Sequence, residues 1–218
     1  MKKHILCFGD SNTHGYCADP SDCADGSTRF NENERWTTLL QKKLGGNYLV
    51  IEEGLSNRTT VFPDPFLEGL AAIDTIAPCL KSHEKIDLLI IMLGTNDTKE
   101  YFSASAPCIA LGMSRLVKKA MTVECWRCQP NILVIAPPPI GGGILEKEIV
   151  RTMGTDCVEK SRQLAKEYKT VCALPGVHFL DAGSLGCEFN KVDCMHLTKR
   201  GHAALAAALG SFIPELVS

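Results

Sequence analysis

Residues 86–97 of the chain read Ile86-Asp87-Leu88-Leu89-Ile90-Ile91-Met92-Leu93-Gly94-Thr95-Asn96-Asp97. The stretch is almost continuously apolar up to Leu93, a pattern typical of a strand that is covered on both faces. Strands of this kind occur in parallel sheets that lie between two layers of helices. The stretch therefore predicts a buried strand of an α/β domain, followed directly by a polar turn.

Four further apolar runs have the length of strands, and longer segments with helical periodicity lie between them. The runs are His4–Phe8, Tyr48–Glu52, Ile132–Ala136 and Val177–Leu180. Apolar residues recur on one helical face within 36–44, 109–120 and 150–168, and a last helix is expected to begin near Thr198 and to end near Pro214. This alternation predicts a three-layer α/β/α sandwich with a parallel sheet and right-handed crossovers.

The size and composition of the chain fit one globular domain over residues 1–218. Of its 218 residues, 45% are hydrophobic and 22% are charged, as is usual for globular rather than disordered proteins. The net charge of −2 and the lack of a basic run argue against a nucleic-acid-binding protein.

No segment of the sequence has the pattern of a membrane span or of a signal peptide. The longest strongly apolar stretch, Leu88–Leu93, is far shorter than the ~20 residues that a membrane-spanning helix needs. The basic start Met1–Lys3 leads into a short apolar run that ends at Gly9, which is too short for the hydrophobic part of a signal peptide. We therefore expect a cytoplasmic protein without membrane or nucleic-acid partners.

The chain has eleven cysteines, an odd number, and no secretion signal accompanies them. A disulfide framework is not expected, because the cytosol keeps thiols reduced. The pair Cys125 and Cys128 has no second pair at the spacing of a zinc finger, so no zinc site is expected. Cysteines in or beside apolar stretches are expected to act as small core residues: Cys7, Cys79, Cys108, Cys157 and Cys172.

Small, polar or turn-forming residues follow every predicted strand. Because the carboxyl ends of parallel strands lie along one edge of the sheet, these segments are expected to border the binding crevice. They are Gly9–Gly15, Gly54–Arg58, Gly94–Asp97, Pro137–Gly143 and Asp193–His196.

Ser11 is the candidate nucleophile at this edge, and His196 is the candidate base. A serine hydroxyl is a weak nucleophile and needs a base to accept its proton. Asp193 lies three residues before His196 and can hold the Nδ1–H of the imidazole, so that Nε2 faces Ser11. Taken singly, each feature has a structural alternative, because Ser11 could cap a helix and Asp193 with His196 could form a turn.

Three further donors at this edge could stabilise the oxyanion that forms during attack on an ester carbonyl. They are the N–H of Ser11, the N–H of Gly54, which can approach closely because glycine has no Cβ, and the side-chain amide of Asn96. Gly54 and Asn96 could instead be turn residues. The coincidence of these features at separate strand ends favours catalysis.

The blocks Gly9-Asp10-Ser11, Gly54, Gly94–Asp97 and Asp193–His196 resemble those of the SGNH hydrolases, also called the GDSL esterase/lipase superfamily. Their order and spacing match over about residues 4–202, which is essentially the whole chain. Other segments resemble the bacterial arylesterase and acetyl-transferring perhydrolase branch, namely Arg35–Thr37, Ile51–Thr60, Ile90–Lys99, Ile109–Met113 and Pro137–Pro139.

The resemblance implies a five-stranded flavodoxin-like sheet and a serine esterase that forms an acyl-enzyme on small, acetyl-like esters. By position, Ser11 is the nucleophile, His196 the general base and acid, and Asp193 its orienting carboxylate. The N–H groups of Ser11 and Gly54 and the side chain of Asn96 form the oxyanion hole. No metal or organic cofactor is implied, and a homo-oligomer is expected.

The sequence departs from this branch beside the nucleophile. Where the branch tends to have Leu and a nearby Trp, this chain has Asn12, His14 and Tyr16. If these side chains line the entrance of the pocket, the entrance is more polar than in the arylesterase relatives. This favours acetylated sugars or other polar esters as substrates.

Two alternative functions use some of the same residues. The acyl group could pass to an alcohol or to hydrogen peroxide instead of water, because the partition depends on the hydration of the pocket. A flavodoxin-like module could instead hold a phosphate or flavin with the loop Ser11–Thr13. The second alternative leaves Asn96 and Asp193–His196 unexplained.

Overall fold

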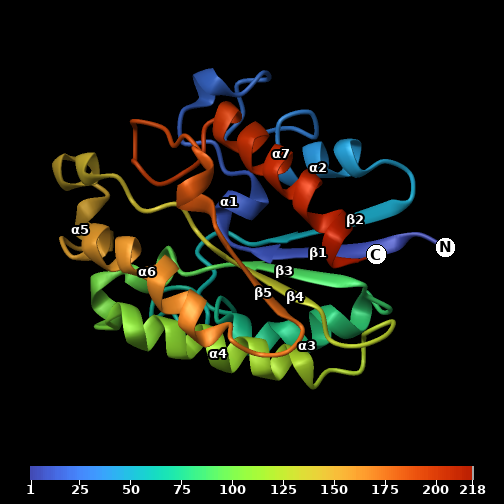
Figure 1. Cartoon of the computed structure of the whole chain (residues 1–218). Coiled ribbons are helices and arrows are strands. Elements are labelled where there is room, and N and C mark those ends of the chain that lie inside the picture. Colours follow the sequence, from blue (N-terminus) through green and yellow to red (C-terminus); the bar gives the residue numbers. More distant parts are fainter. Residues whose placement is uncertain (218) are drawn as a thin grey trace.

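The computed structural model describes residues 1–217 and contains a five-stranded parallel sheet with the strand order β2-β1-β3-β4-β5 (Figure 1). In this order the chain reverses direction across the sheet between β1 and β3, which places a binding crevice at the carboxyl ends of these strands. The strands are β1 (Lys3–Gly9), β2 (Tyr48–Gly54), β3 (Leu88–Met92), β4 (Ile132–Ala136) and β5 (Val177–Asp181). The predicted fold class is confirmed.

Burial differs between the inner strands and the edge strands of the sheet. Every residue of β3 and β4 is buried, whereas β2 and β5 are partly exposed along their length. This explains why the stretch around β3 is almost continuously apolar in sequence: both of its faces are covered by helices.

Helices cover both faces of the sheet (Figure 1). One face packs on α2 (Trp36–Leu44) and α7 (Lys199–Leu216), and the other on α3 (Ala72–Ser82), α4 (Ala106–Met121) and α6 (Cys157–Val171). Shorter elements border the carboxyl edge or connect the layers: α1 (Ser11–His14), α5 (Val150–Met153), and the 3-10 turns Pro20–Asp22, Asn96–Thr98, Glu100–Phe102, Gly142–Glu146 and Ala182–Leu185.

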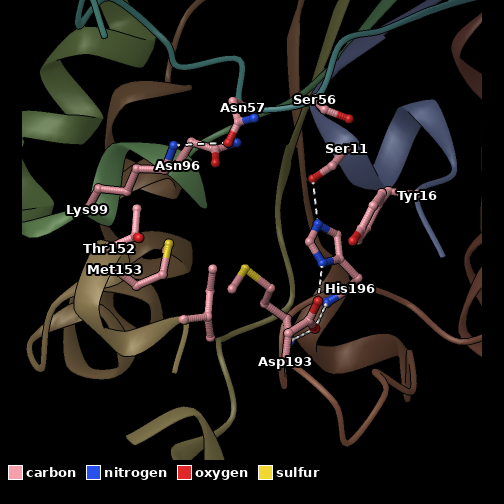
Figure 2. Close-up of a pocket in the computed structure, with 12 residues that line it drawn as sticks. Ser11, Tyr16, Ser56, Asn57, Asn96, Lys99, Thr152, Met153, Asp193 and His196 are labelled. Atoms are coloured by element: carbon pink, nitrogen blue, oxygen red, sulfur yellow. Dashed lines mark hydrogen bonds and ion pairs between the residues drawn. The ribbon is translucent and has the colours of Figure 1, made fainter. Parts of the chain in front are cut away.

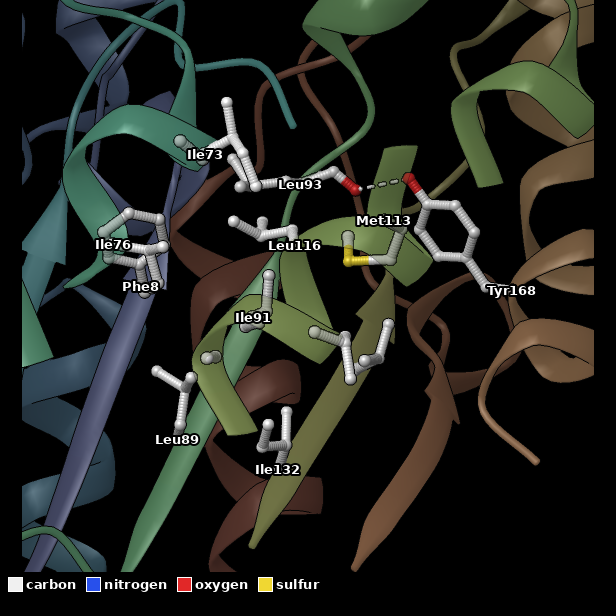
Figure 3. Close-up of a cluster of buried hydrophobic side chains, with 14 of the residues drawn as sticks. Phe8, Ile73, Ile76, Leu89, Ile91, Leu93, Met113, Leu116, Ile132 and Tyr168 are labelled. Atoms are coloured by element: carbon white, nitrogen blue, oxygen red, sulfur yellow. Dashed lines mark hydrogen bonds between the residues drawn. The ribbon is translucent and has the colours of Figure 1, made fainter. Parts of the chain in front are cut away.

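The larger core cluster fixes the end of β3, where the polar turn begins (Figure 3). The hydroxyl of Tyr168, which is fully buried on α6, donates a hydrogen bond to the carbonyl oxygen of Leu93 at 3.1 Å. Gly94 follows with φ 128°, and a Cβ at this position would lie 2.4 Å from the Tyr168 hydroxyl oxygen. Only glycine fits here, so the core sets the direction in which the chain leaves β3 toward Asn96.

Three helical features differ from the sequence prediction. Helix α3 was not predicted. The segment 150–168 is divided into α5 and α6 by Gly154, which has φ 79° and packs against Glu100 so closely that a Cβ would lie 2.3 Å from that residue's Cβ. Helix α7 continues past Pro214 to Leu216, because Ile213 and Val217 on either side of the proline are buried in the core.

All eleven cysteines are free. Cys7, Cys157 and Cys172 are buried as expected, but Cys79 is only half-buried and Cys108 is exposed. The expectation for Cys108 is wrong because this residue lies near the start of α4 on the side that faces away from the core. Within residues 1–217, no helix is long and apolar enough to cross a membrane.

His202 is a fully buried histidine on α7 that packs against α2 in the same layer. Its Nδ1 accepts a hydrogen bond from the N–H of Trp36 at 3.2 Å, and its ring meets Phe30 edge-on. Burial, with smaller contributions from the charges of His196 and Arg35, lowers the pKa of His202 to about 3. The ring therefore stays neutral in the folded protein at pH values where it is protonated in the unfolded chain.

We expect His202 to destabilise the fold as the pH falls. The pKa of His202 is lower in the folded protein than its unfolded value of about 6.5. Its contribution to the free energy of unfolding is therefore complete above about pH 6.5 and is lost as the pH falls below that value, by about 1.4 kcal/mol per pH unit. Urea unfolding at pH 7, 6 and 5 should show this slope as a difference between the wild type and His202→Asn. The buried carboxyls Asp10 and Asp97, with pKa values raised to about 6 by burial, act in the opposite direction but equally in both proteins. Parallel curves would contradict the prediction.

Candidate active site

A cavity of about 280 Å³ lies at the carboxyl edge of the sheet. It is bordered by the loops that follow β1, β2 and β3, by α5, and by the loop before α7 (Figure 2). Its lining residues are Ser11, Tyr16, Ser56, Asn57, Asn96, Lys99, Ile149, Thr152, Met153, Asp193, Met195 and His196.

Ser11 is the first residue of the short helix α1, directly after β1. The side chain of Asp10 caps this helix by accepting the N–H of Asn12 at 3.0 Å, and Gly15 ends it with φ 86°. Gly9 lets the chain turn sharply, because a Cβ there would lie 2.1 Å from the hydroxyl of Thr13. The N–H of Ser11 lies in the first turn, where backbone N–H groups have no partner within the helix.

His196 and Asp193 meet Ser11 at the cavity although they are far away in sequence. His196 Nε2 lies 2.8 Å from Ser11 Oγ, and His196 Nδ1 lies 2.6 Å from Asp193 Oδ2 (Figure 2). The other oxygen of Asp193 accepts the N–H groups of Met195 and His196, both at 3.1 Å. Burial opposes ionisation of Asp193, but the hydrogen bonds from His196 and these backbone groups outweigh it and hold its pKa below the usual value.

The imidazole of His196 is held in place by its neighbours. Tyr16 packs against the ring at a centroid distance of 4.6 Å. Asn190, which sequence reasoning missed, accepts the N–H of Asp193 at 3.0 Å and donates to the carbonyl oxygen of His196 at 2.8 Å. Cys194 turns the chain between the two site residues with φ 60°. A single asparagine in a loop carries no sequence signal that distinguishes it from a turn residue.

Asn12 and His14 do not line the cavity, in contrast to the expectation from their place beside Ser11. Asn12 is buried, and its amide accepts the N–H of Leu197 at 2.9 Å and donates to the carbonyl oxygen of Met195 at 3.3 Å. It therefore ties the turn after β1 to the loop that carries His196. Of the three predicted entrance residues only Tyr16, which follows the end of α1 at Gly15, lines the cavity.

The three candidate oxyanion donors are held at this edge by different contacts. Asn96 lines the cavity, and one hydrogen of its amide is donated to the carbonyl oxygen of Arg58 at 3.1 Å, which leaves the second hydrogen for a ligand. Gly54 ends β2 against α1, where a Cβ would lie 2.1 Å from the backbone nitrogen of His14. Any larger residue would push β2 away from the turn that carries Ser11.

Two buried carboxyl groups support these loops without lining the cavity. Asp97 accepts both the N–H and the hydroxyl of Thr60, and thereby joins the turn after β3 to the loop after β2. Burial raises the pKa of both Asp97 and Asp10 to about 6. Asp10 is the cap of α1, and its side chain accepts the N–H of Asn12 rather than lining the cavity.

The lining residues that sequence reasoning missed are of two kinds. Ser56 and Asn57 lie in the segment Gly54–Arg58 singled out after β2, and Lys99 ends the segment Ile90–Lys99 that resembles the family, so their neighbourhood was indicated but not their direction. Ile149, Thr152 and Met153 come from α5 and its preceding turn, which carry no motif. Their presence depends on how the chain between β4 and α6 folds over the sheet edge.

Within residues 1–217, one group of side chains has the composition of a metal site. Glu53, Cys79 and His83 lie close together and are partly buried, and His83 Nε2 is 2.7 Å from Glu53 Oε1. None of the three lines the cavity. The contact between His83 and Glu53 is that of an ordinary histidine–carboxylate pair at the end of α3.

The comparisons with known proteins cover nearly the whole chain. A family model described as the GDSL-like Lipase/Acylhydrolase family matches residues 7–204. The native aryl esterase of M. smegmatis is 38% identical, with 98% of this chain and 99% of that chain covered and a TM-score of 0.87. Est24, a carbohydrate acetylesterase from Sinorhizobium meliloti, is 34% identical, with 99% and 100% covered and a TM-score of 0.86.

A more distant structure shares the fold. This member of the lipolytic protein G-D-S-L family from Veillonella parvula is 15% identical, with 98% of this chain and 100% of that chain covered and a TM-score of 0.69. A comparison with curated proteins finds no match.

Proposed function

Because the chain belongs to the GDSL-like lipase/acylhydrolase family and is an esterase or acylhydrolase of that family, we propose that it hydrolyses small acyl esters, acetyl esters above all, through Ser11, His196 and Asp193. The observation that carries the proposal is the continuous chain of hydrogen bonds from Asp193 through His196 to Ser11. Membership of this family also makes the chain an enzyme rather than a phosphate- or flavin-binding module.

The first half of the reaction forms an acyl-enzyme. His196 Nε2 accepts the proton of Ser11 as Oγ attacks the ester carbonyl carbon, and Asp193 stabilises the resulting imidazolium. The negative charge that develops on the carbonyl oxygen is met by the second amide hydrogen of Asn96 and by the N–H groups of Ser11 and Gly54. His196 then gives its proton to the leaving alcohol.

The second half releases the acid. A water molecule takes the place of the alcohol, His196 accepts its proton, and the hydroxide attacks the carbonyl carbon of the acyl group on Ser11. The same donors stabilise the second tetrahedral intermediate. Collapse of this intermediate returns the proton from His196 to Ser11 Oγ and restores the free enzyme.

The size of the cavity and the comparisons both support a small acyl group. A volume of about 280 Å³ is slightly below the usual range for ligand pockets, which is about 300–1,000 Å³. Ile149, Met153 and Met195 give the cavity an apolar side suited to a methyl group. The name of one neighbour, carbohydrate acetylesterase, supports acetyl as the acyl group.

The proposal is tested with p-nitrophenyl esters of graded chain length. We expect kcat/KM for the acetate to exceed that for the octanoate by on the order of tenfold or more, because each methylene that does not fit costs binding energy in the transition state. Spontaneous hydrolysis and the Ser11→Ala protein supply the background rates. Faster cleavage of the octanoate would contradict the small-acyl assignment.

A further inference from the structure

Asn57 lies in the loop after β2 and lines the catalytic cavity, yet it has no part in the mechanism above. Its backbone has φ 66°, a left-handed conformation that asparagine tolerates better than most residues. Its side-chain oxygen Oδ1 accepts a hydrogen bond from Lys99 Nζ at 3.1 Å, across 42 residues of sequence. The position of its amide is thus defined from both the backbone and the side chain.

Lys99 is itself held firmly. Its side chain is only 4% exposed, and its ammonium lies 3.6 Å from Asp64 Oδ2. Asp64 in turn accepts the hydroxyl of Tyr101 at 2.7 Å and the N–H of Phe66 at 2.9 Å. Burial lowers the pKa of Lys99, and the carboxylates of Asp64, Asp97 and Asp10 oppose this effect and favour the ammonium.

This contact decides which way the Asn57 amide faces. An ammonium only donates hydrogen bonds, so the atom that faces Lys99 must be the oxygen of the amide, and the NH₂ group must face the opposite way. Figure 2 shows the nitrogen of Asn57 turned toward the side of Ser56 and Ser11. Among the hydrogen bonds within residues 1–217, this nitrogen has no acceptor, which leaves both of its hydrogens for a ligand.

We propose that Asn57 is a specificity-determining residue whose NH₂ group donates a hydrogen bond to an oxygen in the alcohol part of the ester, and that Lys99 is the positioning residue that fixes this orientation. The proposal rests on the proposed function: an acetyl group has no oxygen except its carbonyl, which the oxyanion donors take, so the acceptor must belong to the alcohol. The substrates selected are esters of alcohols that carry a neighbouring hydroxyl or ether oxygen, as partly acetylated sugars do.

The test uses two esters of equal size that differ in one atom. In 2-methoxyethyl acetate an ether oxygen, which only accepts hydrogen bonds, replaces one methylene of n-butyl acetate. We expect the wild type to prefer the methoxyethyl ester in kcat/KM. Asn57→Asp keeps the size, the backbone tolerance and the contact with Lys99 but removes the donor, and it should reduce this preference by on the order of 3- to 10-fold. Asn57→Gly should do the same while keeping the left-handed backbone.

A double-mutant cycle tests the role of Lys99. Lys99→Met should also reduce the preference for the methoxyethyl ester, because the amide is then free to turn over. In the Asn57→Gly protein the same substitution should not change the preference ratio further, so the double variant should have the same ratio as Asn57→Gly alone. A purely structural role of Lys99 would change rates with both esters alike and would not produce this dependence on Asn57.

The outcomes separate this inference from the proposed function. If the wild type cleaves both esters and is labelled at Ser11 by a fluorophosphonate, but the ratio is the same in Asn57→Asp and Asn57→Gly, the assignment of Asn57 is overturned and the esterase assignment stands. If neither ester is cleaved and Ser11 is not labelled, both fail. A lower ratio of methoxyethyl to butyl ester cleavage in both Asn57 variants supports the assignment of Asn57. The role of Lys99 is supported if Lys99→Met lowers this ratio in the wild type but not in the Asn57→Gly protein.

Discussion

Ser11→Ala is expected to lower kcat for p-nitrophenyl acetate by on the order of 10⁶-fold, close to the loss seen when a whole triad is removed. No other hydroxyl is bonded to His196 Nε2, whose partner among the described residues is Ser11 Oγ at 2.8 Å. Without this oxygen no acyl-enzyme forms, and the remaining donors only polarise the ester for attack by water. The measurement is the initial rate over the spontaneous rate, together with the mass of the protein after fluorophosphonate treatment.

The matched control is the second serine of the cavity. Ser56 lines the same space (Figure 2), but within residues 1–217 the His196 ring is hydrogen-bonded to Ser11 and Asp193 and not to Ser56. Ser56→Ala should therefore still gain the mass of the fluorophosphonate, whereas Ser11→Ala should not. The thermal unfolding temperature of Ser11→Ala should stay near that of the wild type, because the side chain is small and, among the described side chains, its hydroxyl is hydrogen-bonded to His196 alone. Covalent labelling of Ser11→Ala at another serine would contradict the assignment of the nucleophile.

Asp193→Asn is expected to lower kcat by on the order of 10⁴-fold while leaving the loop in place. The amide oxygen can keep the two backbone hydrogen bonds from Met195 and His196, which Asp193 Oδ1 accepts now. The amide NH₂ then faces His196 Nδ1, which must become an acceptor. The proton of the neutral ring moves to Nε2, and this nitrogen can no longer accept the proton of Ser11.

The measurement for Asp193→Asn is kcat/KM across the pH range 5–9, with Asp156→Asn as a control. Asp156 is an exposed residue at the start of α6 that makes no side-chain capping hydrogen bond, so its replacement should change neither rate nor stability. Because the defect lies in the wrong tautomer, raising the pH should not restore the rate of Asp193→Asn to that of the wild type. A variant within tenfold of the wild type would show that Asp193 does not orient the base.

The alternation of apolar runs and periodic segments predicted the layers of the fold, because burial on both faces of β3 and β4 leaves no polar positions in these strands. The ends of the helices were less predictable from the sequence. Gly154 ends α5 because it packs against Glu100, and α7 passes Pro214 because its neighbours are buried. Both depend on contacts with residues that are distant in sequence.

For the site, the sequence alone determined which residue types lie at the strand ends, and so the family, the fold and the candidates Ser11, Asp193 and His196. Only the tertiary structure decided which side chains face the cavity. Asn12 adjoins Ser11 but points into the protein, whereas Asn57 points into the cavity, with its amide held by Lys99. The physical reason is that periodicity records how deeply a residue is buried, while its partners are set by the packing of loops that share no local pattern.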